Sequence, residues 1–408
     1  MTPKRPRCLF VSSYFPPMVG GSVVYYRYLL SQCTPADVLV LARTHERSAE
    51  FDAAAPYPIV RTSLLPCFGC DSRARKLVGV LALFPMLLYR VLRHRVSVLH
   101  LGNFFPDILA GWPVARLTGR RLIVTILAEE LTTEKVGQRR FLRPFQRFFN
   151  AVARWALRRC DRVLTIGGFT KSQLIACGVP EQRIFVITPG IDLNKSRRGR
   201  PIAAEIASRL AGKRLVLTVG RFMPRKGQDM TIRAMPRVLA RHPNVAYVMA
   251  GGGHCDNYDE CVQLVDQLNL RDHAFLLRDL DDESIAWLYE HCDVFVMANR
   301  TMPDGDTEGY GIVFLEAGAW GKPVVGGRAG GAVDAVDDRV TGILVDGYSE
   351  QSIADGIDQL LSDPSLAQRM GEAGRRKAND NSWNAKCRDY CQLIETLTHS
   401  RNTAISRD

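Results

Sequence analysis

The sequence predicts an α/β protein built from two domains, each with a parallel β-sheet. Its 408 residues suffice for two domains of ordinary size, and 46% hydrophobic with 24% charged residues is typical of a folded globular chain. Short apolar runs of strand length alternate with helical patterns in both halves. This alternation indicates parallel sheets, because parallel strands need a crossover connection, usually a helix, between them.

The first domain is expected to cover residues 1–193. It opens with a buried strand at 7–12, a turn rich in Pro and Gly at 14–21, and a helix over 22–31 that Ser22 caps. Further strands are predicted at 36–42, 96–101, 121–126 and 162–166, with a helix over 141–158.

The second domain is expected to cover residues 194–380, beginning with the polar, basic stretch 194–201. Its strands are predicted at 214–219, 245–250, 274–277, 293–298, 322–326 and 341–345, and its helices at 228–241, 282–292 and 350–361. A last helix near 383–400 is expected to pack back on the first domain. The carboxyl ends of the two sheets would then face a central cleft, where α/β proteins bind ligands.

Charge is distributed unevenly along the chain, whose net charge is +12. Residues 1–200 carry 31 Lys and Arg against 12 Asp and Glu, whereas residues 201–408 carry 23 against 30. We expect the basic half to face an anionic surface or acceptor. A basic face that serves only solubility is the alternative, and no nucleic-acid-binding motif accompanies the charge.

Neither an export signal nor a membrane span is predicted. The apolar run at 8–11 is too short for a signal peptide, and the longest apolar stretch, 77–92, is interrupted by a proline and an arginine. The eleven cysteines are scattered, and the C-x2-C pair Cys67 and Cys70 lacks a second pair at zinc-ribbon spacing. We therefore expect a cytoplasmic protein with reduced thiols and no metal.

Two glutamates eight residues apart flank a helix start in the second domain. Gly309 and Gly311 suit a tight turn, and an apolar run of helical length follows, so Glu308 lies beside the helix N-terminus and Glu316 lies farther along the helix. Eight helical residues rise about 12 Å, too far for the carboxylates to share a proton or a metal. A nucleotide-diphosphate sugar fits this spacing, because its hydroxyls reach the carboxylates while helix amides hold its phosphates. Two solvated acids on an amphipathic helix are the alternative.

A second candidate anion site is the loop 220–227, which follows a predicted strand. It carries Arg221, Arg225 and Lys226, and two or three cations can neutralise a diphosphate without a metal. Basic surface loops are common, so the loop alone does not establish a site.

Paired glycines mark two further strand ends. Gly20 and Gly21 place backbone amides at a helix start in the first domain, and Gly251 and Gly252 allow close approach of the backbone to a ligand. Neither the G-x-G-x-x-G nor the Walker spacing is present.

Together these motifs resemble the retaining family 4 glycosyltransferases of the GT-B fold, over nearly the whole chain. The sequences of residues 224–229 and 311–316 are most similar to those of the bacterial phosphatidylinositol mannosyltransferase group. The resemblance implies a metal-independent enzyme that uses no cofactor and takes a hexosyl group from GDP-mannose or a UDP-hexose. It also implies a lipid-linked or glycan-precursor acceptor.

The resemblance also implies roles for individual residues. Glu308 is the expected catalytic residue and holds the donor sugar together with Gly309 and Tyr310, while Glu316 binds the ribose. The donor diphosphate is expected at Arg221, Lys226, Gly20, Gly21, Gly311, Ile312 and Val313, and Gly251 and Gly252 lie near the nucleotide. Retention would proceed on one face of the sugar, with the departing phosphate oxygen taking the acceptor proton. Cations and helix amides aimed at that phosphate suit this chemistry.

One position departs from the family pattern. Relatives usually carry a histidine in a turn after a strand of the first domain, and the matching residue here is Leu127, which cannot hydrogen-bond a sugar hydroxyl. There are three interpretations. The histidine's contact with the donor sugar is lost in this chain, the donor is unusual, or His100 at a neighbouring strand end makes the contact instead. The simpler interpretation of His100 is a buried core histidine.

A basic, aromatic segment of the first domain is the candidate acceptor surface. Five aromatic residues are interleaved with seven arginines, namely Arg139, Arg140, Arg143, Arg147, Arg154, Arg158 and Arg159. This pattern suits docking on an anionic bilayer surface. The resemblance favours a lipid-linked acceptor on the cytoplasmic face of the membrane. A domain helix whose aromatics pack in the core is the alternative.

Two other functions remain open at this point. A nucleotide-sugar epimerase uses the same architecture and needs no acceptor groove. A catalytically degenerate member of the family would bind only nucleotide sugar or membrane, as a scaffold. The observation that favours this alternative is Leu127 in place of the family histidine.

Overall fold

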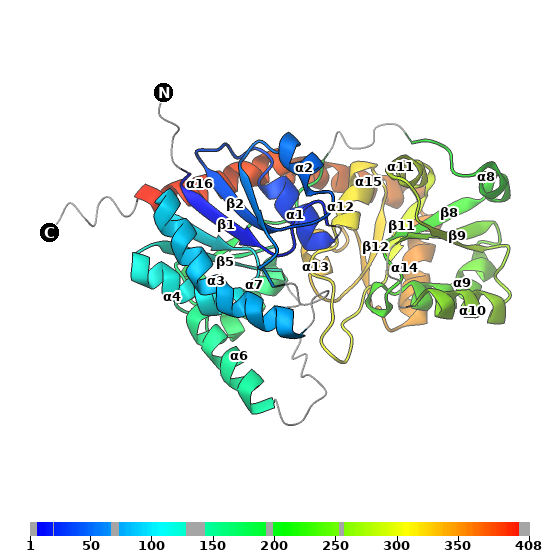
Figure 1. Ribbon diagram of the computed structural model, residues 1–408. Helices are drawn as coiled ribbons and strands as arrows, with labels where there is room; N and C mark the ends of the chain where they lie inside the picture. Colours follow the sequence, from blue (N-terminus) through cyan, green and yellow to red (C-terminus); the bar gives the residue numbers. More distant parts are fainter. Residues whose placement is uncertain are drawn as a thin grey trace. The chain divides into compact units, whose positions relative to one another are not determined.

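The computed structural model describes residues 6–18, 20–66, 73–127, 143–192, 199–252 and 257–399 (Figure 1). The chain forms two compact units. Unit 1 contains the residues up to Thr188 and those from Trp383 onward, and unit 2 is Pro189–Ser382. The expected cleft between the two units stays a prediction.

Unit 1 is built on a seven-stranded, entirely parallel sheet in the order β3-β2-β1-β4-β5-β6-β7. Its strands are β1 (Cys8–Ser12), β2 (Val38–Arg43), β3 (Ile59–Thr62), β4 (Val98–Leu101), β5 (Arg121–Ile126), β6 (Arg162–Thr165) and β7 (Ile184–Val186). The central strands are buried on both faces, as expected of a parallel sheet covered by helices. In the register, Phe10 of β1 lies beside Val40 of β2 and His100 of β4.

The helices of unit 1 begin with α1, which follows the first strand. They are α1 (Gly21–Leu29), α2 (Ser48–Ala54), α3 (Arg73–His94), α4 (Asp107–Thr118), α6 (Arg143–Leu157), α7 (Gly168–Ala176) and α16 (Trp383–His399). The prediction that Ser22 caps α1 is wrong. The helix begins one residue earlier, with Gly20 at the N-cap, and the Gly20 carbonyl accepts the first helical hydrogen bond from Val24.

Helix α16 belongs to unit 1 although it follows unit 2 in the sequence. It packs on α1, where the Trp383 ring stacks on Tyr28 with ring centroids 5.3 Å apart. Farther along, the Tyr390 hydroxyl lies 2.7 Å from Nδ1 of His100. The C-terminal helix is therefore fixed by both aromatic and polar contacts.

Unit 2 contains a six-stranded parallel sheet in the order β10-β9-β8-β11-β12-β13. The strands are β8 (Arg214–Val219), β9 (Val245–Gly251), β10 (Ala274–Arg278), β11 (Val294–Met297), β12 (Val324–Gly327) and β13 (Gly342–Val345). The helices are α8 (Ala204–Leu210), α9 (Gln228–Arg241), α10 (Tyr258–Gln267), α11 (Asp282–His291), α12 (Ile312–Ala319), α13 (Ala332–Ala335), α14 (Glu350–Ser362) and α15 (Pro364–Asp380). The two predicted parallel-sheet domains are thus confirmed.

The strand order of unit 2 reverses at β8. From β8 the chain passes to β9 and β10 on one side, and it returns to β11, β12 and β13 on the other. In open α/β sheets, ligands bind outside the carboxyl ends of the strands at such a reversal. Among the described helices, none is both long and apolar enough to cross a membrane.

Candidate functional site

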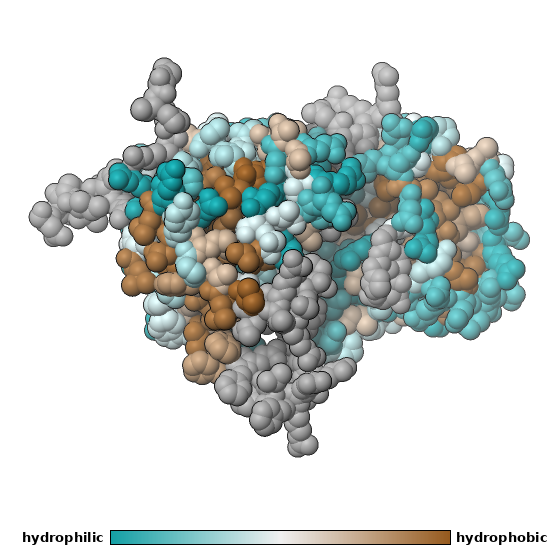
Figure 2. Space-filling model, in the orientation of Figure 1, coloured by the Kyte–Doolittle hydropathy of each residue, from teal (hydrophilic) through white to brown (hydrophobic). Residues whose placement is uncertain are grey.

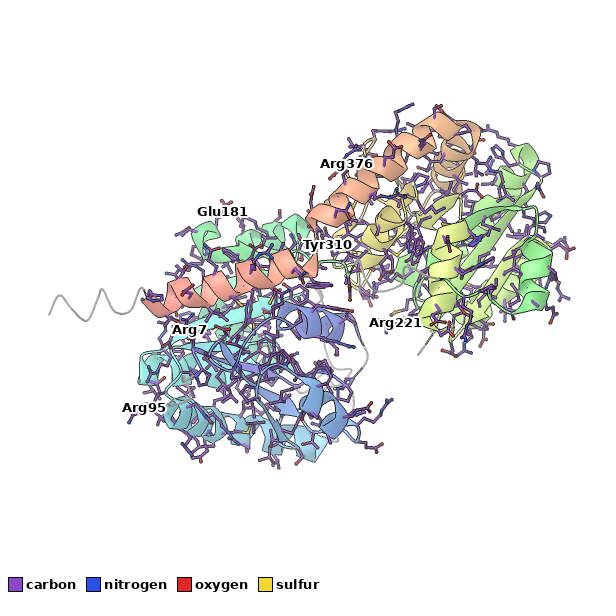
Figure 3. All side chains as sticks on the ribbon, turned by 90° about the horizontal axis from the view of Figure 1, so that it is seen from above. Arg7, Arg95, Glu181, Arg221, Tyr310 and Arg376 are labelled. Carbon is purple, nitrogen blue, oxygen red and sulfur yellow. The ribbon has the colours of Figure 1, made fainter. Side chains whose placement is uncertain are left out.

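The loop that follows β8 is fixed by its glycine and by side-chain hydrogen bonds. Gly227 has φ +75°, and a Cβ there would lie 2.1 Å from the Ala298 carbonyl oxygen, so only glycine fits. The Gln228 amide donates to the carbonyls of Gly220 at 3.3 Å and Arg221 at 3.0 Å. The loop is therefore held in one shape, with the Arg221 side chain exposed (Figure 3).

Glu308 is the most strongly paired carboxylate of the candidate site. It accepts hydrogen bonds from Arg225 Nη1 at 2.8 Å and from Lys226 Nζ, and all three side chains are nearly buried. Burial alone would raise the pKa of Glu308, but Lys226 and Arg225 outweigh it and lower the pKa to about 2. Glu308 is therefore ionised at neutral pH and cannot serve as a proton donor.

The Arg225 guanidinium lies between two carboxylates, a position that the sequence does not predict. Besides Glu308, its Nε lies 3.3 Å from Asp306, and its carbonyl accepts from the Arg300 amide. The sequence identifies Arg225 only as one of three loop cations. Because its guanidinium is buried between two carboxylates, it orients Glu308, whereas Lys226 and the exposed Arg221 are better placed to meet an anion.

The segment before α12 brings the predicted helix amides to the same place. Gly311 is the N-cap with φ +86°, and a Cβ there would lie 2.7 Å from the Phe314 ring. Ile312 and Val313 form the first turn, where helix N–H groups lack partners within the helix and favour an anion. Gly309 is partly exposed, whereas the Tyr310 side chain is only 3% exposed, so Tyr310 can offer a ligand mainly its backbone.

Glu316 is the fifth residue of α12, whereas Glu308 lies four residues before the helix begins. The expectation that eight helical residues separate the two carboxylates is therefore wrong. The Tyr289 hydroxyl of α11 donates a 2.8 Å hydrogen bond to its carboxylate. Burial and the neighbouring Glu316 charge raise the pKa of Tyr289 well above its usual value, so this hydroxyl remains a donor. Tyr289 is a positioning residue for Glu316 that no motif in the sequence marks.

A glycine pair after β12 supports the Glu308 backbone. The Gly331 amide donates to the Glu308 carbonyl at 2.7 Å, and Gly330 also lies against this segment. At the neighbouring strand end, the Asn299 side chain accepts from the Gly327 amide and donates to the Ala329 carbonyl. Paired glycines a few residues after a predicted strand are the sequence signal for this loop.

The remaining predicted residues lie at two places. Gly251 ends β9 beside Gly220, whose amide donates to the carbonyl of Ala250, so Gly251 and Gly252 border the β8 loop. Gly20 and Gly21 lie in unit 1 at the start of α1, and their part in a donor site stays a prediction.

His100 is a buried core histidine. It is fully buried in β4, and its ring nitrogens lie 2.7 Å from the hydroxyls of Tyr390 and Thr125. Burial lowers the pKa of His100 to about 3, so it is neutral. The interpretation that His100 takes over the role of the family histidine is therefore wrong. Leu127, at the position of that histidine, has no hydrogen-bonding side chain.

Apolar side chains are exposed on three neighbouring helices of unit 1. Helices α3 and α6 both pack against α4, and Figure 2 shows apolar surface over this region. We call the following exposed residues the apolar patch: Leu81, Leu92, Leu117, Phe148, Phe149 and Trp155. The Phe148 side chain is 63% exposed and the Phe149 side chain 44% exposed. The alternative that these two aromatic residues pack in the core is therefore wrong. Phe141 and Phe145 of the same segment lie outside the residues whose side chains are described.

Arginines lie beside the aromatic rings of this patch. The Arg159 guanidinium lies 4.4 Å from the centre of the Trp155 ring, and Trp155 contacts Trp112 edge to face. Arg158 is exposed, and Arg154 is partly exposed. The end of α6 and the two residues that follow it thus combine apolar and cationic groups at the surface.

Two family models match almost all of the chain. Residues 19–195 match the model of Glycosyltransferase Family 4, and residues 203–377 match that of Glycosyl transferases group 1. A "GDP-mannose-dependent alpha-(1-6)-phosphatidylinositol monomannoside mannosyltransferase" of Mycolicibacterium smegmatis is 33% identical over 96% of this chain and 98% of its own. A protein with the same name from Mycobacterium tuberculosis is 31% identical over 90% of this chain and 92% of its own.

Solved structures share the two-unit fold. HepE from Anabaena, crystallised with UDP, matches with a TM-score of 0.75 and 18% identity over 96% of this chain and all of its own. Sucrose-phosphate synthase from Thermosynechococcus elongatus matches with a TM-score of 0.75 and 22% identity over 97% of this chain and all of its own. The GT-B fold predicted from the motifs is thereby confirmed.

Proposed function

Because the chain belongs to the family 4 glycosyltransferases, we propose that it transfers a mannosyl group from GDP-mannose to a phosphatidylinositol-derived lipid. The chain is a glycosyltransferase, and the proposal concerns its donor and its acceptor. Both mycobacterial relatives are named for GDP-mannose and for a phosphatidylinositol monomannoside, and the matches cover at least 90% of this chain and 92% of each relative.

The observation that carries the nucleotide-sugar part of the proposal is the ionised Glu308 beside Lys226, just before α12. An ammonium with three donors can bind Glu308 and still donate to a phosphate oxygen. The α12 amides add further donors at the same place. A sugar hydroxyl donating to Glu308 and a diphosphate on Lys226, Arg221 and the helix amides would fill this arrangement.

The proposed transfer is metal-independent and retains the anomeric configuration. Cations and amides stabilise the charge that develops on the departing phosphate. The departing phosphate oxygen takes the proton of the acceptor hydroxyl, which attacks from the same face of the sugar. Glu308 stabilises positive charge on the sugar ring, and Glu316 holds the ribose hydroxyls while Tyr289 orients it. Removal of divalent metals with EDTA is expected to leave the rate unchanged.

The apolar patch and its arginines are proposed to hold the enzyme on the cytoplasmic face of an anionic bilayer. Exposed aromatic rings insert at the boundary between head groups and acyl chains, and neighbouring arginines bind anionic head groups. An enzyme seated in this way would reach a lipid acceptor without leaving the surface.

The donor is tested with a thermal-shift panel of GDP-mannose, GDP-glucose, UDP-glucose and UDP-N-acetylglucosamine. A ligand that binds the native state alone raises the melting temperature in proportion to RT ln(1 + [L]/Kd). We expect the largest rise with GDP-mannose, and the rise should be much smaller in Lys226→Ala. A larger shift with a UDP-sugar would overturn the donor assignment, and no shift with any of the four would indicate an inert scaffold.

Membrane binding is tested by flotation with vesicles of phosphatidylcholine with and without phosphatidylserine. The variant Phe148→Ser/Phe149→Ser should lose binding to anionic vesicles, and Arg154→Glu should weaken it. The matched controls, Val340→Ser and Arg376→Glu, alter an exposed apolar residue and an exposed arginine of unit 2. Equal flotation of the unit 1 variants and these controls would contradict the proposal.

A further inference from the structure

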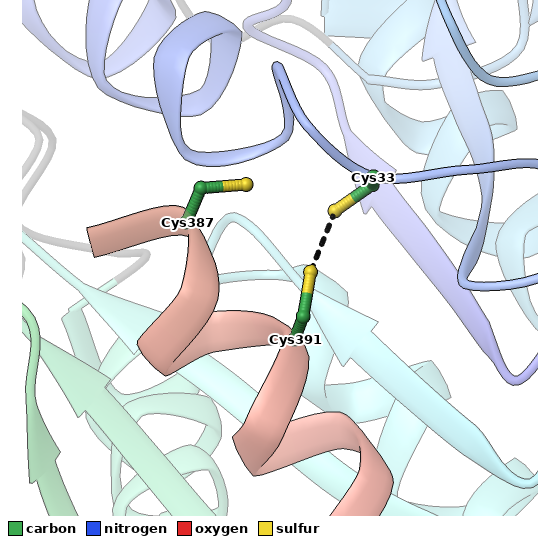
Figure 4. A group of neighbouring side chains, drawn as sticks. All are labelled: Cys33, Cys387 and Cys391. Atoms are coloured by element: carbon green, nitrogen blue, oxygen red, sulfur yellow. Dashed lines mark hydrogen bonds between the residues drawn. The ribbon is translucent and has the colours of Figure 1, made fainter. Parts of the chain in front are cut away.

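Three cysteine thiols converge in unit 1, in a different unit from Glu308. Cys33 follows α1 in a tight turn, and Cys387 and Cys391 lie one turn apart on α16 (Figure 4). The three sulfur atoms lie within 4.8 Å of one another, and those of Cys33 and Cys391 are 3.5 Å apart. Among the described residues this is the one group of three or more potential metal ligands at such distances.

Contacts that do not involve the sulfur atoms hold the cluster together. Trp383 stacks on Tyr28, and the Gln32 side-chain amide donates to Asn384 at 2.6 Å, which fixes α16 against the end of α1. The Cys33 amide donates to the Leu30 carbonyl at 2.9 Å, which fixes the turn. The sulfur atoms are therefore brought together by the fold before any ligand is bound.

We propose that Cys33, Cys387 and Cys391 bind one thiophilic d10 metal ion, Zn²⁺ or Cu⁺, through three thiolates. Zinc–sulfur bonds are about 2.3 Å, which places the sulfur atoms of a tetrahedral site about 3.8 Å apart. The sulfur atoms of Cys33 and Cys391, 3.5 Å apart, already meet this spacing. The other sulfur–sulfur distances are at most 4.8 Å, so they need to shorten by no more than about 1 Å, which small side-chain rotations can achieve. Thiolate ligands select soft or borderline cations over Mg²⁺ or Ca²⁺.

Metal binding by these thiols is expected to depend on pH. Cysteine binds a metal ion as the thiolate, so binding releases protons and strengthens with rising pH.

A metal explains the cluster better than a disulfide does. A disulfide needs the sulfur atoms about 2.05 Å apart and uses only two of the three thiols. Cys33 and Cys387 are fully buried and Cys391 is partly exposed, so an ion can reach the group past Cys391. The sequence does not predict this group, since Cys33 and Cys391 are 358 positions apart.

The test uses the full-length protein, reduced and stripped of metal. Cys67, Cys70 and Cys255 are changed to Ser in every sample, because they lie outside the described residues and could chelate on their own. Zn²⁺ is titrated against a chromophoric chelator, and Co²⁺ is added separately to record its absorption. We expect one equivalent of tightly bound Zn²⁺ and a thiolate-to-cobalt charge-transfer band, both weakening as the pH is lowered.

Single variants locate the ligands. Cys33→Ser, Cys387→Ser and Cys391→Ser should each lose the charge-transfer band and the tight equivalent, whereas Cys177→Ser, a partly exposed cysteine of the same unit, should keep both. Zn²⁺ should also protect Cys391 from alkylation, and melting curves without metal verify that each variant is folded. The proposal is overturned if Zn²⁺ binds the triple Cys→Ser variant as tightly, or if Cys33 and Cys391 form a disulfide in air that Zn²⁺ does not prevent.

Discussion

At the residue scale, the main feature of the candidate site is the pairing of Glu308 with Lys226 and Arg225. Lys226 and Arg225 lower the pKa of the nearly buried Glu308 and so keep it ionised at neutral pH. The carboxylate therefore acts as a hydrogen-bond acceptor, and we propose that Lys226 also donates to a phosphate oxygen of the donor.

Replacement of Lys226 by alanine should lower kcat/KM by about two to three orders of magnitude, the usual effect of removing one preorganised electrostatic donor. The fold should persist, because Arg225 still compensates Glu308. Steady-state transfer and a melting curve measure the two effects. Lys213→Ala, in the same unit but bonded to the Asp272 carbonyl instead, is the matched control. Normal turnover of the Lys226 variant would refute the diphosphate assignment.

The stability of the protein should depend on Glu308 in a defined pH range. Its pKa is lowered from the ordinary value of 4.5 to about 2, so its contribution is complete above pH 4.5 and is lost as the pH falls towards 2. Relative to Glu308→Gln, this amounts to about 3 kcal/mol of unfolding free energy at neutral pH.

Urea unfolding of both proteins at pH 7, 4.5 and 3 measures this difference. The gap between wild type and Glu308→Gln should be nearly constant from pH 7 to 4.5 and smaller at pH 3. A gap that does not change with pH would show that the ion pairs do not act as described.

At the scale of elements, the start of α12 depends on Gly311. Its φ of +86° is strained for any residue with a Cβ, and a Cβ would also collide with the Phe314 ring. Gly212 has a similar φ of +72° but no atom near its Cβ position, so it reports the backbone strain alone.

We expect Gly212→Ala to cost about 1–2 kcal/mol, and Gly311→Ala to cost more and to reduce transfer strongly. Chemical denaturation and transfer assays on both variants measure the two effects. Equal losses of stability and activity in the two variants would mean that close packing at the α12 start has no role in the site.

Elements with a strong local pattern can be predicted from the sequence. The strand β8 is a run of apolar residues followed by a glycine, and α12 begins at a glycine turn, so both follow from burial and backbone geometry. The start of α1 is misjudged because Gly20 rather than Ser22 serves as the cap.

At the scale of the whole molecule, contacts between distant segments escape local patterns. Arg225 and Glu308 are 83 positions apart, and the convergence of Cys33 with Cys391 depends on α16 returning to unit 1. The motifs therefore predict candidate site residues, while the fold determines which of them pair.

The proposed activity requires both a nucleotide-sugar site and a membrane-binding surface. The nucleotide-sugar site is assigned mainly to unit 2, and the apolar patch belongs to unit 1. An enzyme acting on a lipid at a bilayer surface needs both, and the excess of basic residues in the first 200 positions accords with such a surface.

The most direct test of the central claim is transfer of radiolabelled mannose from GDP-mannose to vesicles containing phosphatidylinositol or its monomannoside, in the presence of EDTA. We predict label in the organic extract that α-mannosidase releases, and none with Glu308→Ala. Label that stays in the aqueous phase as GDP-mannose or free mannose, or a lipid product that resists α-mannosidase, would contradict the account.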